Sequence, residues 1–167
     1  MRNKDSDSKP QVESSLKVDP TSENRFKALK LQLQGSDSIL LVSHEQTYGP
    51  IFNKRNDSYV EAKRIVENDV INKKAIHTTS LIKDRDKESL INILTQKLKG
   101  EPIDLAHCFD PHHAIIVISK GRIGYIEFCF SCGGVSGDKV DISSTDFDKE
   151  KWDKIYKYID SKIPITE

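Results

Sequence analysis

The stretch that decides the fold is HCFDPHHAIIVISKGRIGYIEFCFSC, which runs from His107 to Cys132. Its middle contains two apolar runs, AIIVIS (Ala114 to Ser119) and RIGYIEFCF (Arg122 to Phe130), separated by Lys120 and Gly121. A run of apolar residues with almost no alternation is typical of a strand that is covered on both faces, and two residues between such runs suit a tight turn. The stretch therefore predicts a β-hairpin at the centre of a sheet.

The length of the turn determines which residues face each other in this hairpin. A two-residue turn pairs Ser119 with Arg122. In that register His112 lies opposite Cys129. A three-residue turn instead brings His113 diagonal to Cys129 on the same face. The sequence leaves both registers open, so either histidine is a candidate to face the thiol.

The rest of the chain predicts an α+β domain. SILLVSH (Ser38 to His44) and IHTTSLI (Ile76 to Ile82) are rich in stiff, β-branched residues and predict strands. The spacing of apolar residues in DRDKESLINILTQKLKG (84–100) and STDFDKEKWDKIYKYID (144–160) predicts two amphipathic helices. We expect a mostly antiparallel sheet with the hairpin at its centre, covered by these two helices.

Residues at the ends of these helices indicate where each one starts or stops. Asp84 or Asp86 is expected to cap the start of the first helix, since a carboxylate accepts hydrogen bonds from free backbone N–H groups. Gly100 suits a left-handed stop for the same helix. Thr145 lies near the expected start of the second helix and is a candidate cap there.

The first 24 residues, MRNKDSDSKPQVESSLKVDPTSEN, are polar and contain no apolar run of the kind found in a signal peptide or membrane span. Such a segment cannot repay the entropy of ordering. We expect a disordered tail over residues 1–24 and a single α+β domain over residues 25–167. The expected location is the cytoplasm. The alternative is a lipoprotein, because a polar leader also resembles the tether behind a removed lipoprotein signal.

Charge excludes one class of partner. The 167-residue chain has 26 Lys and Arg residues against 26 Asp and Glu residues, so its formal net charge is zero. Proteins that bind nucleic acid or anionic membranes nonspecifically depend on an excess of positive charge. We therefore expect no nucleic-acid partner. The missing apolar run leads us to expect no membrane span either.

All three cysteines of the chain lie at the two ends of the hairpin. CFSCGG (129–134) contains a Cys-x-x-Cys followed by glycine, a spacing that allows two thiolates to converge on one metal ion. One more cysteine and one histidine complete a tetrahedral Cys₃His site for zinc, with either His113 or His112 as the histidine. The predicted ligands of this structural zinc are Cys108, His113, Cys129 and Cys132, with His112 as the alternative ligand.

Two other interpretations of the cysteines remain open. Cysteine is among the most buried residue types, so the three thiols also fit a role as small core residues. Cys129 and Cys132 have the spacing of a redox dithiol too, although this pair ends a strand and does not open a helix whose dipole lowers a thiol pKa. His44 and His77 lie in apolar stretches and are interpreted as core or edge histidines, not as ligands.

CFDPHHAI followed by GYIEFCFSC resembles the motif of an uncharacterised family of small bacterial proteins, many from Bacteroidetes-type genomes. The family motif is Cys, an aromatic residue, any residue, Pro-Arg-His, an apolar strand, a turn, and Ile-Cys-Phe-x-Cys. The resemblance covers about residues 76 to 134 and implies no established activity. His112 stands where the family usually has arginine, so a role that needs a permanent cation is not expected at this position. The residues that match are Cys108, Pro111, His113, Cys129, Phe130 and Cys132.

The leading functional hypothesis is a small non-enzymatic bacterial protein that holds a structural zinc and binds a protein partner, for example as an immunity protein for a toxin. It rests on the balanced charge and on the concentration of chemistry-bearing motifs in the hairpin. The expected contact surface is formed by Phe130 and Val135, the apolar residues around the Cys-x-x-Cys turn. The alternative is a thiol redox protein or enzyme that uses the Cys129/Cys132 dithiol.

Overall fold

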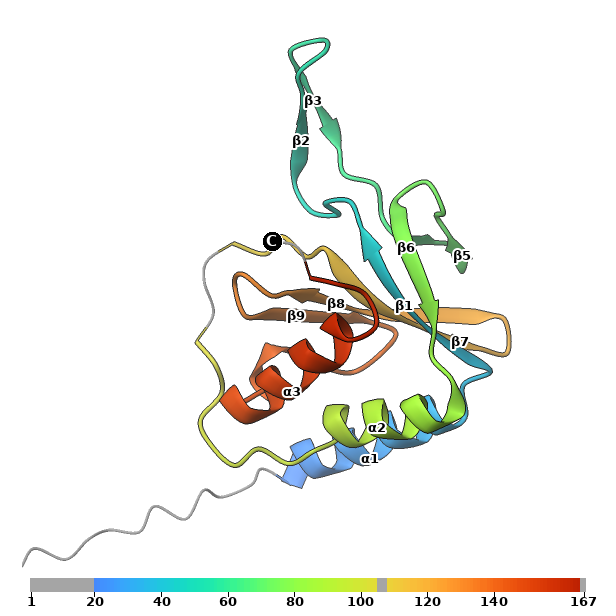
Figure 1. The fold of residues 1–167 in the computed structure, drawn as a ribbon, viewed down its shortest axis with the longest axis vertical. Helices are drawn as coiled ribbons and strands as arrows, with labels where there is room; N and C mark the ends of the chain where they lie inside the picture. Colours follow the sequence, from blue (N-terminus) through green and yellow to red (C-terminus); the bar gives the residue numbers. More distant parts are fainter. Residues whose placement is uncertain (1–19, 105–107, 166–167) are drawn as a thin grey trace, which may run out of the picture.

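The computed structural model describes residues 20–104 and 108–165, which form three α-helices, a five-stranded antiparallel sheet and two small hairpins (Figure 1). The strand order in the sheet is β6-β1-β7-β8-β9, so the hairpin of β7 and β8 occupies its middle. The α+β class and the mostly antiparallel sheet with a central hairpin are therefore confirmed. The strands are β1 Ser38–His44, β6 Ile76–Leu81, β7 His113–Ser119, β8 Arg122–Cys129 and β9 Gly134–Asp138.

The turn of the central hairpin has two residues. Lys120 and Gly121 have φ values of 49° and 77°, which are the left-handed values of a type I′ turn. Ser119 pairs with Arg122, as the shorter of the two predicted turns requires. In this register His113 pairs with Phe128, and His112 lies just before the start of β7.

Strand β7 is buried on both faces, which explains its nearly continuous apolar sequence. Ile115 and Val117 pack in the main core beneath the helices. Ala114 and Ile116 point to the other face and pack in a smaller cluster with residues from the segment 65–75. That segment contains the small hairpin of β4 Val66–Glu67 and β5 Val70–Ile71. The domain thus has a core on each side of its sheet.

Three helices cover one face of the sheet, where two were expected: α1 Pro20–Gln34, α2 Asp84–Leu94 and α3 Lys149–Asp160. Helix α1 is held by the buried side chains of Phe26, Leu29 and Leu33, which recur at helical spacing. Its start at Pro20 corrects the expected boundary of the tail, because residues 20–24 are helical. The remainder of the predicted tail, residues 1–19, lies outside the described residues.

The helix ends differ from those expected. Helix α2 follows Lys83, which makes no side-chain capping bond, and it ends at Leu94 instead of continuing to Gly100. Helix α3 is capped by Asp148, whose carboxylate accepts a hydrogen bond from the backbone N–H of Lys151. The residues before it, including Thr145, form the short 3₁₀ helix η1 Ser144–Asp146.

The second small hairpin projects from the body of the molecule (Figure 1). It consists of β2 Pro50–Asn53 and β3 Ser58–Glu61, which pair with each other in a two-stranded sheet of their own. We call residues 50–61 the arm. A short loop, residues 45–49, connects the end of β1 to the arm, so the base of the arm lies beside the central sheet.

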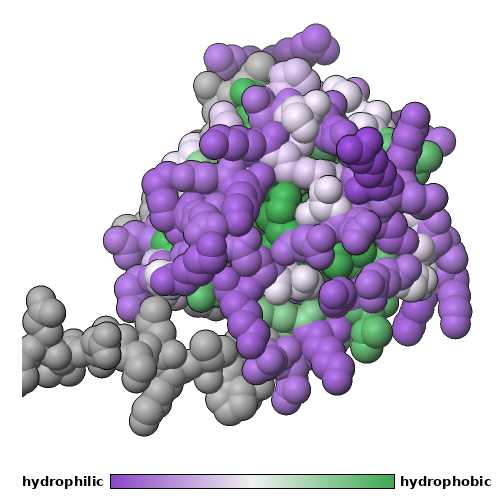
Figure 2. Space-filling model, turned by 60° about the horizontal axis from the view of Figure 1, so that its bottom comes forward, coloured by the Kyte–Doolittle hydropathy of each residue, from purple (hydrophilic) through white to green (hydrophobic). Residues whose placement is uncertain are grey.

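The helical side of the molecule has a mostly hydrophilic surface, interrupted by small, separate apolar areas (Figure 2). One exposed apolar side chain on this side is Leu31 of α1. Within residues 20–104 and 108–165, no helix combines the length and the apolar character needed to cross a lipid bilayer.

Candidate functional site

A cleft of about 720 Å³ lies where the base of the arm meets the face of the sheet that the helices leave free. Its walls come from the loop after β1, the two ends of the arm, and strands β8 and β9. We call it the Glu127 cleft, after the carboxyl group at its floor. The side chains that give it chemical character are those of Thr47, Tyr48, Glu61, Arg64, Tyr125, Glu127, Ser136 and Asp138.

Glu127 is a buried carboxyl group in the middle of an otherwise apolar strand. Strand alternation places it with Tyr125 on the face of β8 opposite to Ile126 and Phe128, which pack under the helices. The residue is 1% exposed, and the hydroxyl of Thr47 donates a 2.7 Å hydrogen bond to its Oε1 atom. The burial of this carboxyl at the floor of a cleft marks the site as a candidate for binding.

Burial also sets the protonation of the cleft. It raises the pKa of Glu127, and hydrogen bonding with Thr47 and Tyr48 offsets part of this rise. Burial, together with the nearby Glu127 charge, raises the pKa of Tyr48 and raises that of Tyr125 to about 12. Both tyrosines are therefore neutral at physiological pH, and both line the cleft.

His44 lies behind Glu127, with its side chain fully buried. Its Nδ1 atom is 2.7 Å from the carbonyl oxygen of Glu45, and because a carbonyl only accepts, Nδ1 carries the proton. Burial lowers the pKa of His44 to about 4, so the ring is neutral at pH 7 and Nε2 has a free lone pair. Nε2 is 4.0 Å from Oε1 of Glu127 and has no hydrogen-bond partner among the described residues.

The rim of the cleft has an excess of negative charge. Glu61 ends the arm, and Asp138 ends strand β9, so both carboxylates reach the cleft from exposed positions. Arg64 contributes a cation on the same rim. With Glu127 ionised, the lining has three carboxylates and one guanidinium, a net charge of minus two. The site therefore favours a positively charged group.

A second cleft, of about 510 Å³, lies on the other side of His44. His113 is buried there, with burial lowering its pKa, and its Nδ1 atom has no hydrogen-bond partner within the described part of the chain. His112 is half-buried, and its Nε2 atom is 3.4 Å from a carboxylate oxygen of Asp110. His77 is exposed on the edge strand β6, as the edge-histidine interpretation expected.

The structure brings together two of the predicted zinc ligands. Cys129 and Cys132 form a disulfide, and both are buried. Cys108 is a free, exposed cysteine. Among residues 20–104 and 108–165, no three side chains of His, Cys, Asp or Glu are grouped so that they hold a metal ion. A zinc site formed by Cys108, Cys129, Cys132 and either His113 or His112 stays a prediction without support from this geometry.

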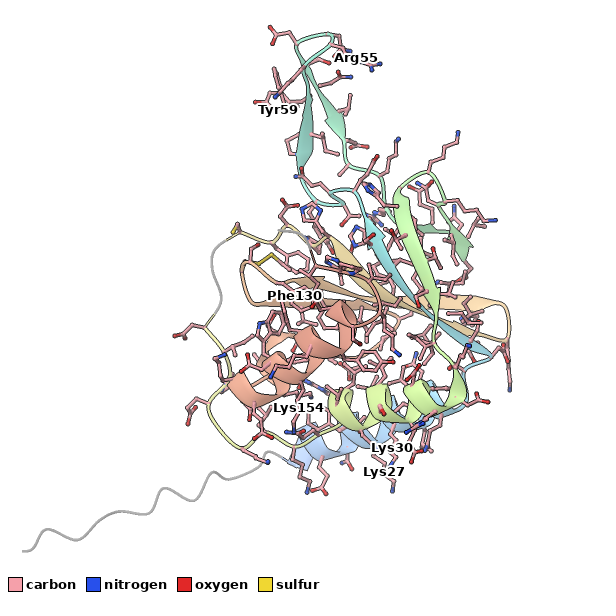
Figure 3. All side chains as sticks on the ribbon, viewed as in Figure 1. Lys27, Lys30, Arg55, Tyr59, Phe130 and Lys154 are labelled. Atoms are coloured by element: carbon pink, nitrogen blue, oxygen red, sulfur yellow. A yellow bond between two sulfur atoms is a disulfide. The ribbon has the colours of Figure 1, made fainter. Side chains whose placement is uncertain are left out.

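The predicted contact surface at Phe130 and Val135 is wrong. Phe130 is only 9% exposed and points into the core between the sheet and α3, whereas Arg55 and Tyr59 stand out on the arm (Figure 3). Its ring contacts those of Trp152 and Tyr156, each at a centroid distance of 5.2 Å. Val135 is buried in the same core. The Cys-x-x-Cys turn folds Phe130 under α3, which alternation along the strand does not reveal.

Several residues of the Glu127 cleft were not predicted from the sequence. One signal was present: a charged residue inside an apolar strand is unusual, and Glu127 is such a residue in RIGYIEFCF. Tyr48 and Thr47 carry no comparable signal, because they lie in a loop. Their place beside Glu127 results from the way the chain turns from β1 into the arm.

Comparisons of the chain with models of protein families, with curated proteins and with solved structures find no match. The resemblance to a bacterial family through the Cys-x-x-Cys hairpin therefore stays a prediction. A function has to be inferred from the chemistry of the clefts and the exposed surface.

Proposed function

We propose that this protein is a non-enzymatic binding protein that recognises a protein partner through its arm. The observation that carries the proposal is a pair of aromatic side chains exposed on a projecting hairpin. Phe52 and Tyr59 face each other across the arm, with ring centroids 5.2 Å apart, and are 44% and 69% exposed. Exposed aromatic residues of this kind are frequent at the centre of protein interfaces.

The energetics of the arm support a role in binding. A two-stranded hairpin is marginally stable in water unless a third strand or a packed layer covers it. The strands of the arm pair with each other, and the aromatic pair is exposed on one face of this hairpin. A partner that covers these side chains buries apolar area at about 25 cal/mol per Å² and so stabilises the arm as it binds.

Charge at the base of the arm favours the same surface. The Glu127 cleft opens beside the first and last residues of the arm, Pro50 and Glu61. A partner therefore meets an apolar pair next to a negatively charged cleft, a combination that supplies both contact area and orientation. By contrast, the helical side offers scattered apolar side chains on a hydrophilic surface (Figure 2).

The proposal is tested by finding the partner and then measuring its affinity. Tyr59 is replaced by the photoreactive amino acid p-benzoylphenylalanine, and the crosslinked protein is identified and purified. Calorimetry then compares the wild type with Phe52→Ala and Tyr59→Ala. We expect each substitution to weaken binding by at least about tenfold, as truncation of a central aromatic residue does.

Leu31→Ala is the matched control, because Leu31 is an apolar side chain with 63% exposure on the helical side. It is expected to leave the affinity unchanged. Equal affinities for the wild type, Phe52→Ala and Tyr59→Ala contradict the proposal. So does a loss of affinity in Leu31→Ala that matches the loss in the arm variants.

Thiol–disulfide exchange is a second candidate function, favoured by the disulfide between Cys129 and Cys132. Exchange needs a thiolate to reach one of the two sulfurs, and here both residues are buried. A disulfide that is reduced and re-formed reversibly in the folded protein supports this candidate. A disulfide that resists reduction until the protein unfolds identifies it as a structural bond.

A further inference from the structure

We infer that the Glu127 cleft binds a primary ammonium group, and that this group is a lysine side chain of the partner protein. The assignment of the lysine to the partner rests on the proposed function. The preference for an ammonium group rests on the cleft alone. The cleft has the size range of known ligand pockets and a buried, hydrogen-bonded carboxyl at its floor.

The first argument is charge complementarity. Glu127, Glu61 and Asp138 face the cleft from three different strands, and Arg64 offsets one of their charges. An anion is repelled by this lining, and a neutral group leaves the charge of the floor carboxylate uncompensated. A cation gains the most, because a charge-assisted hydrogen bond to a buried carboxylate is roughly twice as strong as a neutral one.

The second argument comes from the buried carboxyl at the floor. Glu127 is 1% exposed, and the neutral Nε2 atom of His44, which lies behind it at 4.0 Å from Oε1, carries no proton to donate. The charged form of this carboxylate is therefore stabilised by a further hydrogen-bond donor that enters from the cleft. An ammonium has three N–H donors and a positive charge, so it supplies such a donor and compensates the buried charge.

The third argument is the aromatic wall. Tyr48 and Tyr125 line the cleft, and both remain neutral at physiological pH because their pKa values are raised. A cation near the face of a tyrosine ring is attracted by the ring quadrupole. The methylene stem of a lysine packs favourably against the same rings. A lysine side chain therefore satisfies the floor and the walls together.

The test is an NMR titration of the purified full chain with Nα-acetyl-lysine N-methylamide. We expect saturable shifts of the backbone amides of Thr47, Tyr125 and Ser136, which line the cleft. Glu127→Gln keeps the shape of the floor and removes its charge, so binding is expected to weaken by at least about tenfold. Glu88→Gln, an equal charge change on the exposed face of α2, is expected to leave binding unchanged.

Two further compounds identify the chemistry and its source. The Nε-acetylated form of the same compound lacks the charge and is expected not to bind. Cadaverine supplies free ammonium groups without a peptide, and binding more than about tenfold tighter than the capped lysine overturns the partner lysine as the source. Overturning results for the site itself are no shifts at the three amides, equal binding of the acetylated compound, or undiminished binding by Glu127→Gln.

The pH dependence of this binding is a further readout. Glu127 has to ionise to hold the ammonium, and burial raises its pKa. The affinity for the capped lysine is therefore expected to fall as the pH is lowered from about 7.5 to about 4.5. The other titratable or charged groups near Glu127 are Glu61, Asp138, Arg64, Tyr48, Tyr125 and the buried His44. Glu127→Gln separates their contribution from that of the floor carboxyl.

Failure of this inference differs from failure of the proposed function. If Tyr59→Ala lowers the affinity for the partner while the capped lysine causes no NMR shifts, the ammonium site is wrong and binding through the arm stands. If the capped lysine binds as expected while arm variants keep full partner affinity, the arm is wrong and the ammonium site stands.

Discussion

Lys151 shows how a single buried charge controls stability. Its side chain is fully buried in α3, with Nζ above the rings of Phe26 and Phe147 at 4.4 and 4.7 Å from their centroids. Burial lowers the pKa of Lys151 to about 8, although the carboxylates of Asp146 and Asp148 oppose this shift. The protonated lysine therefore destabilises the fold at neutral pH relative to its neutral form.

The first prediction concerns the pH range just above that pKa. The unfolded chain binds the lysine proton more tightly, with a pKa of about 10.4, so the wild-type free energy of unfolding should rise from pH about 8 to about 9.5. Lys151→Met keeps the packing and removes the titrating group, so this rise of about 1 to 2 kcal/mol should be absent. Urea unfolding at the two pH values measures it, and parallel changes in both proteins would contradict the assignment.

The local sequence was enough to predict the turn of the central hairpin, but not the surroundings of Glu127. The two-residue turn at Lys120-Gly121 followed from local chemistry and was among the sequence's two alternatives. The role of Glu127 depends on partners that lie far away in the chain, since Thr47 is 80 residues distant. Likewise, a redox dithiol was only one of three interpretations of Cys129 and Cys132, which the structure joins in a disulfide.

At the scale of elements, α3 and the end of β8 form one aromatic layer. Phe130 stacks on Phe128 with ring planes 6° apart and also contacts Trp152 of α3. Because Phe130 lies in this layer, its truncation leaves a cavity between sheet and helix. The layer explains why an aromatic residue beside a glycine-bounded turn is part of the core.

The second prediction contrasts Phe130 with Phe52 of the arm. Phe130→Ala should destabilise the protein by about 3 to 5 kcal/mol and leave the intrinsic partner affinity of the folded protein unchanged. Phe52→Ala should change the free energy of unfolding by no more than about 0.5 kcal/mol, since its side chain is exposed. It should weaken the affinity for the partner. Thermal melting and calorimetry of both variants check this, and the reverse pattern would return the interface to the Cys-x-x-Cys turn.

Helices and strands were predicted correctly where apolar residues recur with a clear spacing. The predictions failed where tertiary contacts determine the start or end of an element. Strands β1, β6, β7 and β8 and helices α2 and α3 were all expected in place. Helix α1 was missed because its first residues are as polar as the tail before them, and its buried face is narrow. Helix α2 stops early because residues 95–100 turn to meet Asp148, which accepts hydrogen bonds from the backbone of Lys99 and Gly100.

At the scale of the whole molecule, the buried histidines should make the fold sensitive to acid. The pKa of His44 falls from 6.5 in the unfolded chain to about 4 in the folded protein, and that of His113 is also lowered by burial. Between these values the unfolded chain binds more protons, so stability falls as the pH decreases. Glu127 opposes this slope, because its raised pKa lets the folded state take up a proton first.

The third prediction isolates the contribution of His44. Wild-type free energy of unfolding should decrease from pH about 6.5 to about 4, with about 3 kcal/mol of the decrease due to His44. His44→Asn retains a donor near the position of Nδ1 and does not titrate, so its profile should be flatter. Denaturant unfolding across this range gives the slope, which is the readout regardless of the absolute stability of the variant. An identical slope in both proteins would contradict the buried, neutral state of His44.

The arrangement of the molecule separates stability from recognition. The helices lie on one face of the sheet, and the arm projects from the other end of the molecule (Figure 1). The main core lies beneath the helices, and the Glu127 cleft lies on the face of the sheet that the helices leave free. Arm residues can therefore change without disturbing the main core. This separation is the basis for assigning partner binding to residues 50–61 and to the cleft beside them.

Hydrogen exchange of the backbone amides, measured with and without the purified partner, tests that assignment most directly. We predict slower exchange in the complex at residues 50–61 and at the cleft residues Thr47 and Ser136, with little change in α1, α2 and α3. Protection concentrated on the three helices, with unchanged exchange in the arm, would contradict recognition through the arm and the Glu127 cleft.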